Sequence, residues 1–242
     1  MKIAEKLNAK QDLYNAKPVT IAFLGDSVTQ GCFECFVDEN GDIDTVFDYK
    51  NAYSTRLKEI LNILYPKVQI NIINSGISGD KATGGLKRIE RDILQYAPDL
   101  VVVSCGLNDS TFGLDYLEEY TNSVRSIVKK VKETNAEVIF LTQNFMNTKV
   151  SCHLAEEELI NCAKGSLEIQ NKGVLEKFQL SGLNAAKESG AVICDLYPVW
   201  EKLYECGVDT TELLANKINH PIREWHYYMA IKLIEKIFEI EA

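Results

Sequence analysis

Four residues of this 242-residue chain are of the types that acyl transfer requires. Ser27 offers a hydroxyl that can act as a nucleophile, and His220 offers an imidazole that can take the proton of that hydroxyl. Gly76 has no Cβ, so its backbone N–H can approach a ligand closely, and the side-chain amide of Asn108 can donate a hydrogen bond. A nucleophile, a base and donors for a developing oxyanion form a site that needs no cofactor and no metal ion.

Ser27, Gly76 and Asn108 each lie just beyond an apolar segment that is typical of a buried strand. These segments are residues 19–24, 68–73 and 100–104. The first and third are near-continuous apolar runs, which indicates a parallel sheet covered on both faces. Because open α/β sheets bind ligands at the carboxyl ends of their strands, we expect the three residues to meet at one edge of the sheet.

The rest of the chain continues the alternation of strands and helices. Two more strands are expected at residues 138–141 and 191–194, and helices at residues 51–64, 85–96 and 114–134. Residues 36–49 are polar, acidic and contain glycine, so we expect an irregular excursion there. With no repeat and no linker, the chain is predicted to be one domain over residues 1–242, with an N-terminal arm at 1–17 and a lid at 144–166.

His220 is followed by Pro221 and then by a last helix with an apolar stripe. A proline is compatible with the first turn of a helix, so the histidine is expected at a fixed junction between a loop and this helix. His226 falls inside the same helix, and we expect it to be structural.

Four short motifs, taken together, resemble the four blocks of the SGNH hydrolases, also called the GDSL esterase/lipase family. In chain order they are Gly25-Asp26-Ser27, Asn74-Ser-Gly76-Ile-Ser-Gly79, Gly106-Leu-Asn108-Asp109 and His220-Pro221. Gly-Asp-Ser alone is common by chance, whereas four blocks in order, after predicted strands and over nearly the whole chain, are a strong signal.

The resemblance implies an α/β fold, specifically a flavodoxin-like three-layer αβα sandwich with a central parallel sheet of about five strands. It also implies hydrolysis of small acyl esters through an acyl-serine, with acetyl groups on a carbohydrate as one candidate substrate. By position, Ser27 is the nucleophile and His220 the general base. The backbone N–H groups of Ser27 and Gly76 and the side chain of Asn108 form the oxyanion hole.

Two positions depart from the family pattern. Val28 replaces the usual leucine, which is a change in packing only. Lys217 stands three residues before His220, where the family has an aspartate that orients the imidazole, and a lysine cannot accept its N–H. The sequence leaves open whether Ser27 and His220 work as a dyad or another residue supplies the acceptor. The candidates are Asn216, Asn219, Asp209 and Glu224.

Other interpretations of these residues belong to different classes of protein. Ser27 is also a normal N-cap residue, and a flavodoxin-like module could use Ser27 and Thr29 to hold a phosphate or flavin. Cys32 and Cys35 have the C-x-x-C spacing of redox and zinc sites, although we expect idle thiols there. Further zinc ligands could come from Cys152, His153 and Cys162.

The composition bears on partners and location. A net charge of -9 opposes binding to nucleic acid or to an anionic membrane, so the expected partner is a small-molecule ester. The N-terminus lacks the apolar core of a signal peptide, and no segment is apolar enough to span a bilayer. Seven cysteines, an odd number, suit reduced thiols, and we expect a cytoplasmic protein.

Overall fold

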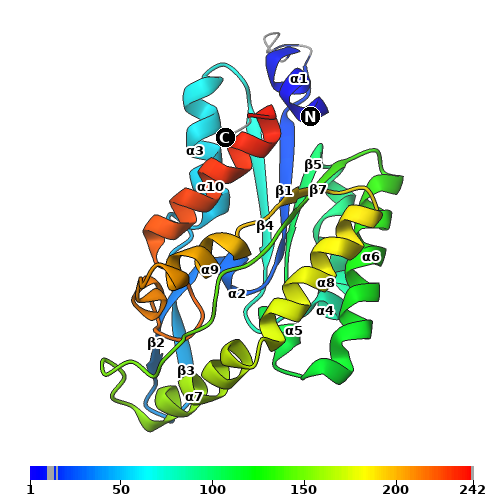
Figure 1. The fold of residues 1–242 in the computed structure, drawn as a ribbon. Coiled ribbons are helices and arrows are strands. Elements are labelled where there is room, and N and C mark those ends of the chain that lie inside the picture. The colour runs from blue at the N-terminus through cyan, green and yellow to red at the C-terminus, as the bar shows by residue number, and fades with distance from the viewer. Residues whose placement is uncertain (10–13, 15, 241–242) are drawn as a thin grey trace.

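Five parallel strands form the central sheet of the computed structural model, which describes residues 1–9, 14 and 16–240 (Figure 1). Across the sheet the strands follow the order β4 (Ile70–Gly76), β1 (Val19–Gly25), β5 (Leu100–Ser104), β6 (Glu137–Leu141) and β7 (Val192–Cys194). Helices cover both faces, so the predicted flavodoxin-like αβα sandwich with about five parallel strands is confirmed. Every residue of β1 is buried, which explains its continuous apolar run.

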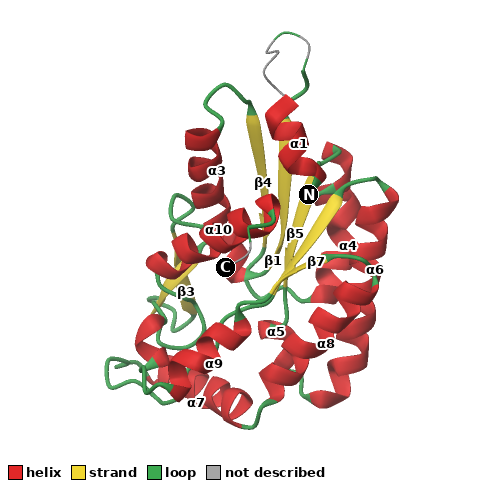
Figure 2. Cartoon of the chain, turned by 45° about the horizontal axis from the view of Figure 1, so that its top comes forward, coloured by secondary structure: helices red, strands yellow, loops and turns green. Residues whose placement is uncertain are grey.

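Alternate residues of β1 pack into two helix layers. Ile21 and Phe23 belong to one core cluster, and Ala22 and Leu24 belong to the other. The first cluster includes residues of α1 (Lys2–Ala9), α3 (Tyr53–Leu64), α9 (Tyr197–Glu205) and α10 (Arg223–Phe238). The second includes residues of α4 (Ala82–Asp92), α6 (Leu117–Glu133) and α8 (Val174–Glu188), which Figure 2 shows together on one side of the sheet.

The expectation of an irregular excursion over residues 36–49 was wrong. An antiparallel hairpin occupies this part of the chain, with strands β2 (Cys32–Val37) and β3 (Ile43–Phe47). Its turn is closed by the Asp38 carboxylate, which accepts from the backbone N–H groups of Asn40 and Asp42. The hairpin lacks a strand pattern because β3 is largely exposed and its register with β2 shifts between Cys32 and Cys35.

The other predicted elements are present with altered ends. The strand predicted at 68–73 becomes β4, two residues later at its start and three longer at its end, and the helix predicted at 85–96 begins at Ala82 and ends at Asp92. Two single-turn helices, α2 (Ser27–Gln30) and α5 (Leu107–Ser110), follow β1 and β5. The predicted lid holds a loop and the first part of α7 (Glu157–Asn171), and part of the predicted arm lies outside the described residues.

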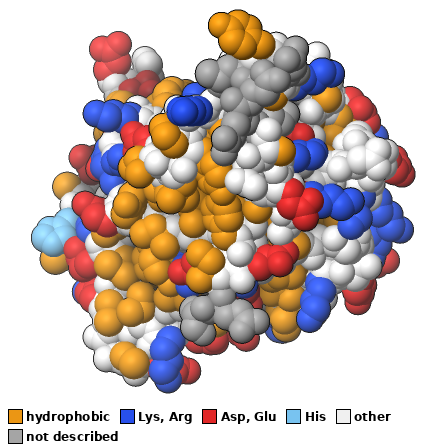
Figure 3. Space-filling view, turned by 90° about the horizontal axis from the view of Figure 1, so that it is seen from above, with side chains coloured by type: hydrophobic (Ala, Val, Ile, Leu, Met, Phe, Trp, Pro, Cys, Tyr) orange, Lys and Arg blue, Asp and Glu red, His pale blue; other side chains and the backbone are white. Residues whose placement is uncertain are grey.

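Figure 3 shows the face seen from above, at the amino-terminal end of the sheet. Hydrophobic side chains gather near the middle of this face, and acidic and basic side chains are interspersed around them. Among the helices that the structure describes, none is both long and apolar enough to cross a membrane.

Candidate active site

Ser27 lies at the carboxyl end of β1, as the first residue of α2. The N-cap of this short helix is Asp26, whose Oδ1 accepts the backbone N–H of Val28 at 3.0 Å. The capping role considered for Ser27 therefore belongs to its neighbour. The Ser27 hydroxyl remains available for another partner.

That partner is His220. The Ser27 Oγ and the His220 Nε2 lie 3.0 Å apart, and both residues are buried. The other ring nitrogen, Nδ1, lies 2.9 Å from the backbone carbonyl oxygen of Phe33. Because a carbonyl can only accept, Nδ1 carries the proton and Nε2 presents a lone pair to the serine hydroxyl. This is the tautomer that a general base requires.

The acceptor behind the histidine is thus a backbone carbonyl. Ser27 and Phe33 occupy both ring nitrogens, so none of the four side chains considered for this role orients the ring. Asn216 and Asn219 bond to each other, Asp209 pairs with Lys149, and Glu224 makes no bond to the imidazole. Phe33 could not be found from residue types, since every residue has a carbonyl.

Asn216 and Lys217 have different tasks in the loop before the histidine. The Asn216 Oδ1 accepts three backbone N–H groups, those of Ile218, Asn219 and His220, at 2.9–3.0 Å. Lys217 adopts a left-handed conformation with φ 59°, and its Nζ lies 2.9 Å from the Glu212 carboxylate. The residue at the position of the family aspartate therefore pairs with Glu212, and neither nitrogen of the imidazole contacts it.

Burial governs the protonation of His220. Loss of hydration lowers the pKa of the imidazole from 6.5 to about 4, and the bond to Phe33 and the charge of Glu34 offset this only in part. The ring is consequently neutral near pH 7 and can accept a proton from Ser27.

Asn108 lies in α5, beyond the carboxyl end of β5. Its Nδ2 donates one hydrogen bond to the carbonyl oxygen of Asp80 at 2.9 Å, which leaves the second N–H of the amide. Among the described residues, the backbone N–H of Ser27 has no hydrogen-bond partner. These two donors have the freedom that an oxyanion hole needs.

Gly76 has a different environment from the one expected. Its N–H donates to the Asn74 Oδ1 at 3.0 Å, so it is engaged rather than free. A Cβ at this position would lie 2.1 Å from the backbone nitrogen of Gln30, so glycine is required for β4 to pack against the helix that carries Ser27. Three residues further on, Gly79 has φ 76°, and its N–H has no partner among the described residues.

Gln143 joins the parts of the site and was missed in the sequence. Its Oε1 accepts the backbone N–H of Leu107 at 2.8 Å, and its Nε2 donates to the Asp26 Oδ2 at 2.7 Å. The residue thereby links α5 to the cap of α2. The signal was its position, because Gln143 also comes just beyond an apolar strand. Burial raises the pKa of the Asp26 carboxyl to about 6, although the bond from Gln143 opposes this.

Arg88 binds backbone groups at the same carboxyl edge of the sheet. Its guanidinium donates to the backbone carbonyls of Gly25 and Ser75 and to the Asp80 carboxylate, at 2.7–3.1 Å. Because Asp80 accepts from Asn108, this buried cation fixes the backbone that supports the candidate oxyanion donor.

None of the other histidines and cysteines bonds to the Ser27 Oγ or to a ring nitrogen of His220. His226 is fully buried and its Nδ1 accepts the backbone N–H of Tyr53, so its predicted structural role is confirmed. All seven cysteines are free, and burial raises the pKa of Cys32 to about 12. No group of three possible metal ligands comes together in the described part of the chain, so the zinc alternative based on Cys32, Cys35, Cys152, His153 and Cys162 finds no ligand set.

The beginning of the predicted lid is fixed to the histidine loop. The Asn144 Nδ2 donates to the carbonyl oxygen of Asn219 at 2.8 Å. The backbone N–H of Asn147 donates to the carbonyl oxygen of Ile218, also at 2.8 Å. Both asparagines are buried. Residues 144–147 therefore form a wall that holds the loop carrying His220.

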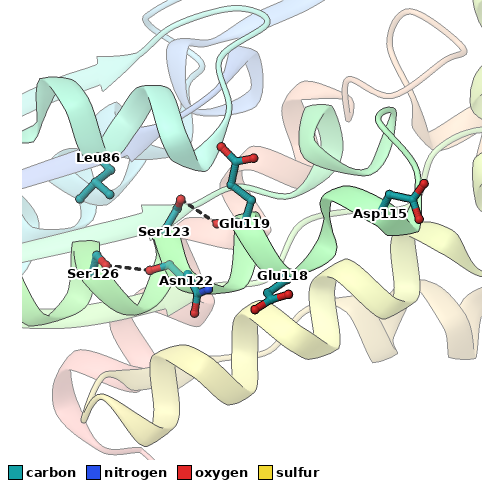
Figure 4. A pocket seen from close by; sticks show the side chains of 7 residues that line it. All are labelled: Leu86, Asp115, Glu118, Glu119, Asn122, Ser123 and Ser126. Carbon is teal, nitrogen blue, oxygen red and sulfur yellow. Dashed lines mark hydrogen bonds between the residues drawn. The ribbon is translucent and has the colours of Figure 1, made fainter.

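A separate hollow lies between α4 and α6 (Figure 4). It is lined by Leu86, Asp115, Glu118, Glu119, Asn122, Ser123 and Ser126, none of which belongs to the site around Ser27. Two of its serines donate to backbone carbonyls of their own helix, Ser123 to Glu119 and Ser126 to Asn122. The hollow is an acidic feature of the helix surface with no nucleophile and base in contact.

The chain has a parallel sheet between two helix layers and a hydrogen-bonded serine and histidine at the carboxyl edge of that sheet. These features place it in the class of three-layer α/β proteins with a serine–histidine site. The sequence profile of the GDSL-like Lipase/Acylhydrolase family matches residues 23–222. The chain therefore belongs to this family, and the resemblance seen in its four motifs is confirmed.

Individual relatives are distant. An acetylxylan esterase of Geobacillus stearothermophilus is 28% identical over 131 residues, which cover 50% of this chain and 58% of that protein. The chain spans about half the length of the curated relatives it matches.

Two solved structures show the same fold. A two-domain esterase active on acetylated mannans has a TM-score of 0.69 at 19% identity, over 100% of this chain and 53% of that one. A catalytic mutant of the acetylxylan esterase from Geobacillus stearothermophilus has a TM-score of 0.66 at 19% identity, over 90% of this chain and 94% of the other.

Proposed function

We propose that this protein is a serine esterase that hydrolyses small acyl esters through an acyl-serine intermediate. The observation that carries the proposal is the 3.0 Å contact between the Ser27 Oγ and the Nε2 of a buried histidine, whose Nδ1–H is directed to a carbonyl. A neutral imidazole in this tautomer can accept only from the hydroxyl side.

In the first step the Ser27 oxygen bonds to the ester carbonyl carbon while His220 takes the hydroxyl proton. When the tetrahedral intermediate collapses, the bond to the alcohol oxygen breaks and the imidazolium returns the proton to the leaving alcohol. Water then attacks the acyl-serine with His220 as base, which releases the acid and restores the hydroxyl. The Phe33 carbonyl keeps the proton of Nδ1 in place throughout.

For the oxyanion hole we propose the Ser27 N–H, the Asn108 side chain and the Gly79 N–H. The Gly79 N–H is preferred to that of Gly76, because the latter already donates to Asn74. The other N–H groups of this loop also have partners: that of Ile77 bonds to Gly25, and that of Ser78 bonds to Gln30. Gly79 is thus the residue of this turn that can turn its N–H toward a ligand.

The substrate class that we propose is an acetylated carbohydrate. Support comes from the names of two similar proteins, an acetylxylan esterase and an esterase active on acetylated mannans. We further propose that the chain acts as one domain in the cytoplasm, with the part of 144–166 beyond the fixed wall as a lid over the site. The seven free thiols favour a reducing compartment.

The phosphate- or flavin-binding alternative has less support. The helix that follows β1 is a single turn of four residues, and the Ser27 hydroxyl is bonded to a histidine. Neither feature suits a phosphate cradle, which relies on several free N–H groups at the start of a longer helix.

Two variants test the chemistry. Hydrolysis of p-nitrophenyl acetate should fall by about 10⁴-fold or more in Ser27→Ala and in His220→Ala, because both groups act in the same step. Ser123→Ala, which removes a serine hydroxyl on α6, is the matched control and should retain full activity. Undiminished hydrolysis by Ser27→Ala would refute the proposal. Oligosaccharides of acetylated xylan and mannan then test the substrate class, with release of acetate as the measurement.

A further inference from the structure

The carbonyl that orients His220 belongs to a hairpin outside the central sheet, so something must hold that hairpin in place. Phe33 lies in β2, whose pairing with β3 is irregular between Cys32 and Cys35. A carbonyl in such a strand is a poor reference point unless other contacts fix it, because bulged pairs lose ladder bonds.

Arg223 supplies several such contacts, beside those that Thr45, Asn216 and His226 make with residues 33–35. It is the first residue of α10, three residues after His220. Its two Nη atoms donate to the two carboxylate oxygens of Glu34 at 2.5 and 3.0 Å, and its Nε donates to Asp48 at 2.7 Å. Its guanidinium also lies 4.3 Å from the centre of the Phe33 ring. The side chain therefore contacts two consecutive residues of β2, Phe33 and Glu34, and also Asp48, which follows β3.

We propose that Arg223 is a positioning residue, which holds the Phe33 carbonyl against the His220 Nδ1–H through its fork to Glu34 and its stacking on the Phe33 ring. This inference rests on the proposed esterase function. Only Pro221 and Ile222 separate His220 from Arg223, and these two residues attach to Phe33 and Glu34, which are neighbours. The loop with the base and the hairpin with its acceptor are thus joined at two adjacent points.

The geometry suits this role better than a role in global stability. The side chains of Arg223 and Glu34 are 33% and 45% exposed, and ion pairs this exposed contribute little to folding. The planar guanidinium makes two parallel bonds to the Glu34 carboxylate, and these bonds restrict the orientation of Glu34 next to the Phe33 carbonyl. Glu34 has a second effect, because its charge raises the pKa of His220 against the larger effect of burial.

The test compares Arg223→Ala with Arg125→Ala. Arg125 is a matched control, since its side chain is 34% exposed and pairs with Glu188, and it bonds to no residue of the hairpin. For Arg223→Ala we expect kcat to fall roughly 10- to 100-fold with KM changed less than about twofold, because misplacing a catalytic group by an ångström costs about this much. Arg125→Ala should stay within about twofold of the parent. Equal kcat for the two variants would overturn the proposal.

A spectroscopic measurement separates positioning from general damage. The chain has three histidines, so ¹⁵N-histidine NMR can assign His220 by comparison with His153→Gln and His226→Gln. The parent should show a single tautomer with the proton on Nδ1, and Arg223→Ala a mixture of tautomers. An unchanged tautomer in Arg223→Ala would also count against the proposal.

Two milder variants keep the test decisive if Arg223→Ala fails to fold. Arg223→Lys keeps the charge without the fork, and Glu34→Gln keeps the shape without the charge. Both should lower kcat, by about three- to tenfold, and a parent-like kcat in both would overturn the proposal. The two levels of inference fail differently: an active Ser27→Ala refutes the esterase, whereas a fully active Arg223→Ala beside an inactive Ser27→Ala refutes only the role of Arg223.

Discussion

The proposed active site has two halves that are built in different ways. The nucleophile half holds the proposed nucleophile Ser27 and the proposed oxyanion donor Asn108, and it lies at the ends of neighbouring strands, where the register pairs Gly25 of β1 with Ser104 of β5. The base half holds the proposed base His220 with the Phe33 carbonyl. It lies outside the sheet and depends on polar bonds between segments 187 residues apart.

The difference shows how each half keeps its geometry. Buried apolar strands position the nucleophile half, so its precision follows from the packing of the main core. The base half obtains its precision from hydrogen bonds to backbone, chiefly those of Asn216 and the wall at residues 144–147. Damage to the first half should therefore reduce chemistry, whereas loss of the buried hydrogen bonds of the second half should reduce chemistry and stability together.

After the loss of Ser27 or His220 themselves, the largest effect is expected in the nucleophile half, at Asn108. Asn108→Ala removes one oxyanion donor and should lower kcat by about 10²- to 10³-fold, with little change in the free energy of unfolding. Asn108→Asp, which keeps the size but adds a charge that repels the oxyanion, should be at least as inactive. Steady-state kinetics on p-nitrophenyl acetate provides the measurement. If Asn108→Ala retained more than a tenth of the parent kcat, the amide would not be an oxyanion donor.

In the base half, Asn216→Ala should affect two quantities at once. It removes the acceptor of three backbone N–H groups, so we expect kcat to fall about tenfold and the free energy of unfolding to drop by about 1–3 kcal/mol. Asn216→Asp keeps the acceptor oxygens and should lose less stability. Urea denaturation and kinetics on the same samples distinguish the outcomes, and a loss of activity without any loss of stability would contradict the division into halves.

The two halves should also respond to pH with opposite sign. His220 has a native pKa of about 4, below its ordinary 6.5, so its contribution to stability is complete above pH 6.5 and declines as the pH falls toward 4. Asp26 has a native pKa of about 6, above its ordinary 3.8, so its contribution is complete below pH 3.8 and declines as the pH rises through 6.

Denaturation of His220→Gln and Asp26→Asn between pH 4 and 8 tests this contrast. The loss in free energy of unfolding caused by His220→Gln should be smaller at pH 4 than at pH 8, by about 1–3 kcal/mol, and the substitution could even stabilise the protein at pH 4. For Asp26→Asn the loss should instead be smaller at pH 8 than at pH 4. In the parent, kcat/KM should rise with pH through about 4 and stay level at neutral pH, because only the neutral imidazole is a base. An acid limb near pH 6.5 would mean that His220 is hydrated.

The smallest effect is expected from Lys217→Asp, which restores the residue type of the family at this position. The side chain is directed to Glu212, and the Nδ1–H of His220 is already bonded to Phe33, so we expect no gain in kcat. Lys217→Ala serves as the control for the lost ion pair. A rise in kcat specific to the aspartate would show that this side chain reaches the imidazole.

The sequence predicts the nucleophile half well and the base half incompletely. Ser27 and Asn108 follow apolar runs, and a parallel sheet brings the ends of such runs together, so pattern alone places them. Gly76 was recognised as a special position, but only the packing against Gln30 shows why glycine is needed there. His220 was found through its motif, yet its partner Phe33 lies in a hairpin whose exposed strand has no apolar pattern.

The short motif Cys32-Phe33-Glu34-Cys35 illustrates the same limit. Its cysteines drew attention because their spacing suggests a metal or redox site, whereas the two residues between them contact His220 and Arg223. Side-chain chemistry can be recognised in a sequence, but a backbone acceptor and the ion pair that holds it depend on the path of the chain.

Use of a main-chain oxygen as the third member of the site has a consequence for mutation. A point substitution can delete an aspartate, but no substitution can delete the carbonyl of residue 33, since all twenty amino acids provide one. This member is therefore sensitive to chain length and not to residue identity. One residue inserted or removed between β1 and Phe33 would bring a different carbonyl to the imidazole, or none.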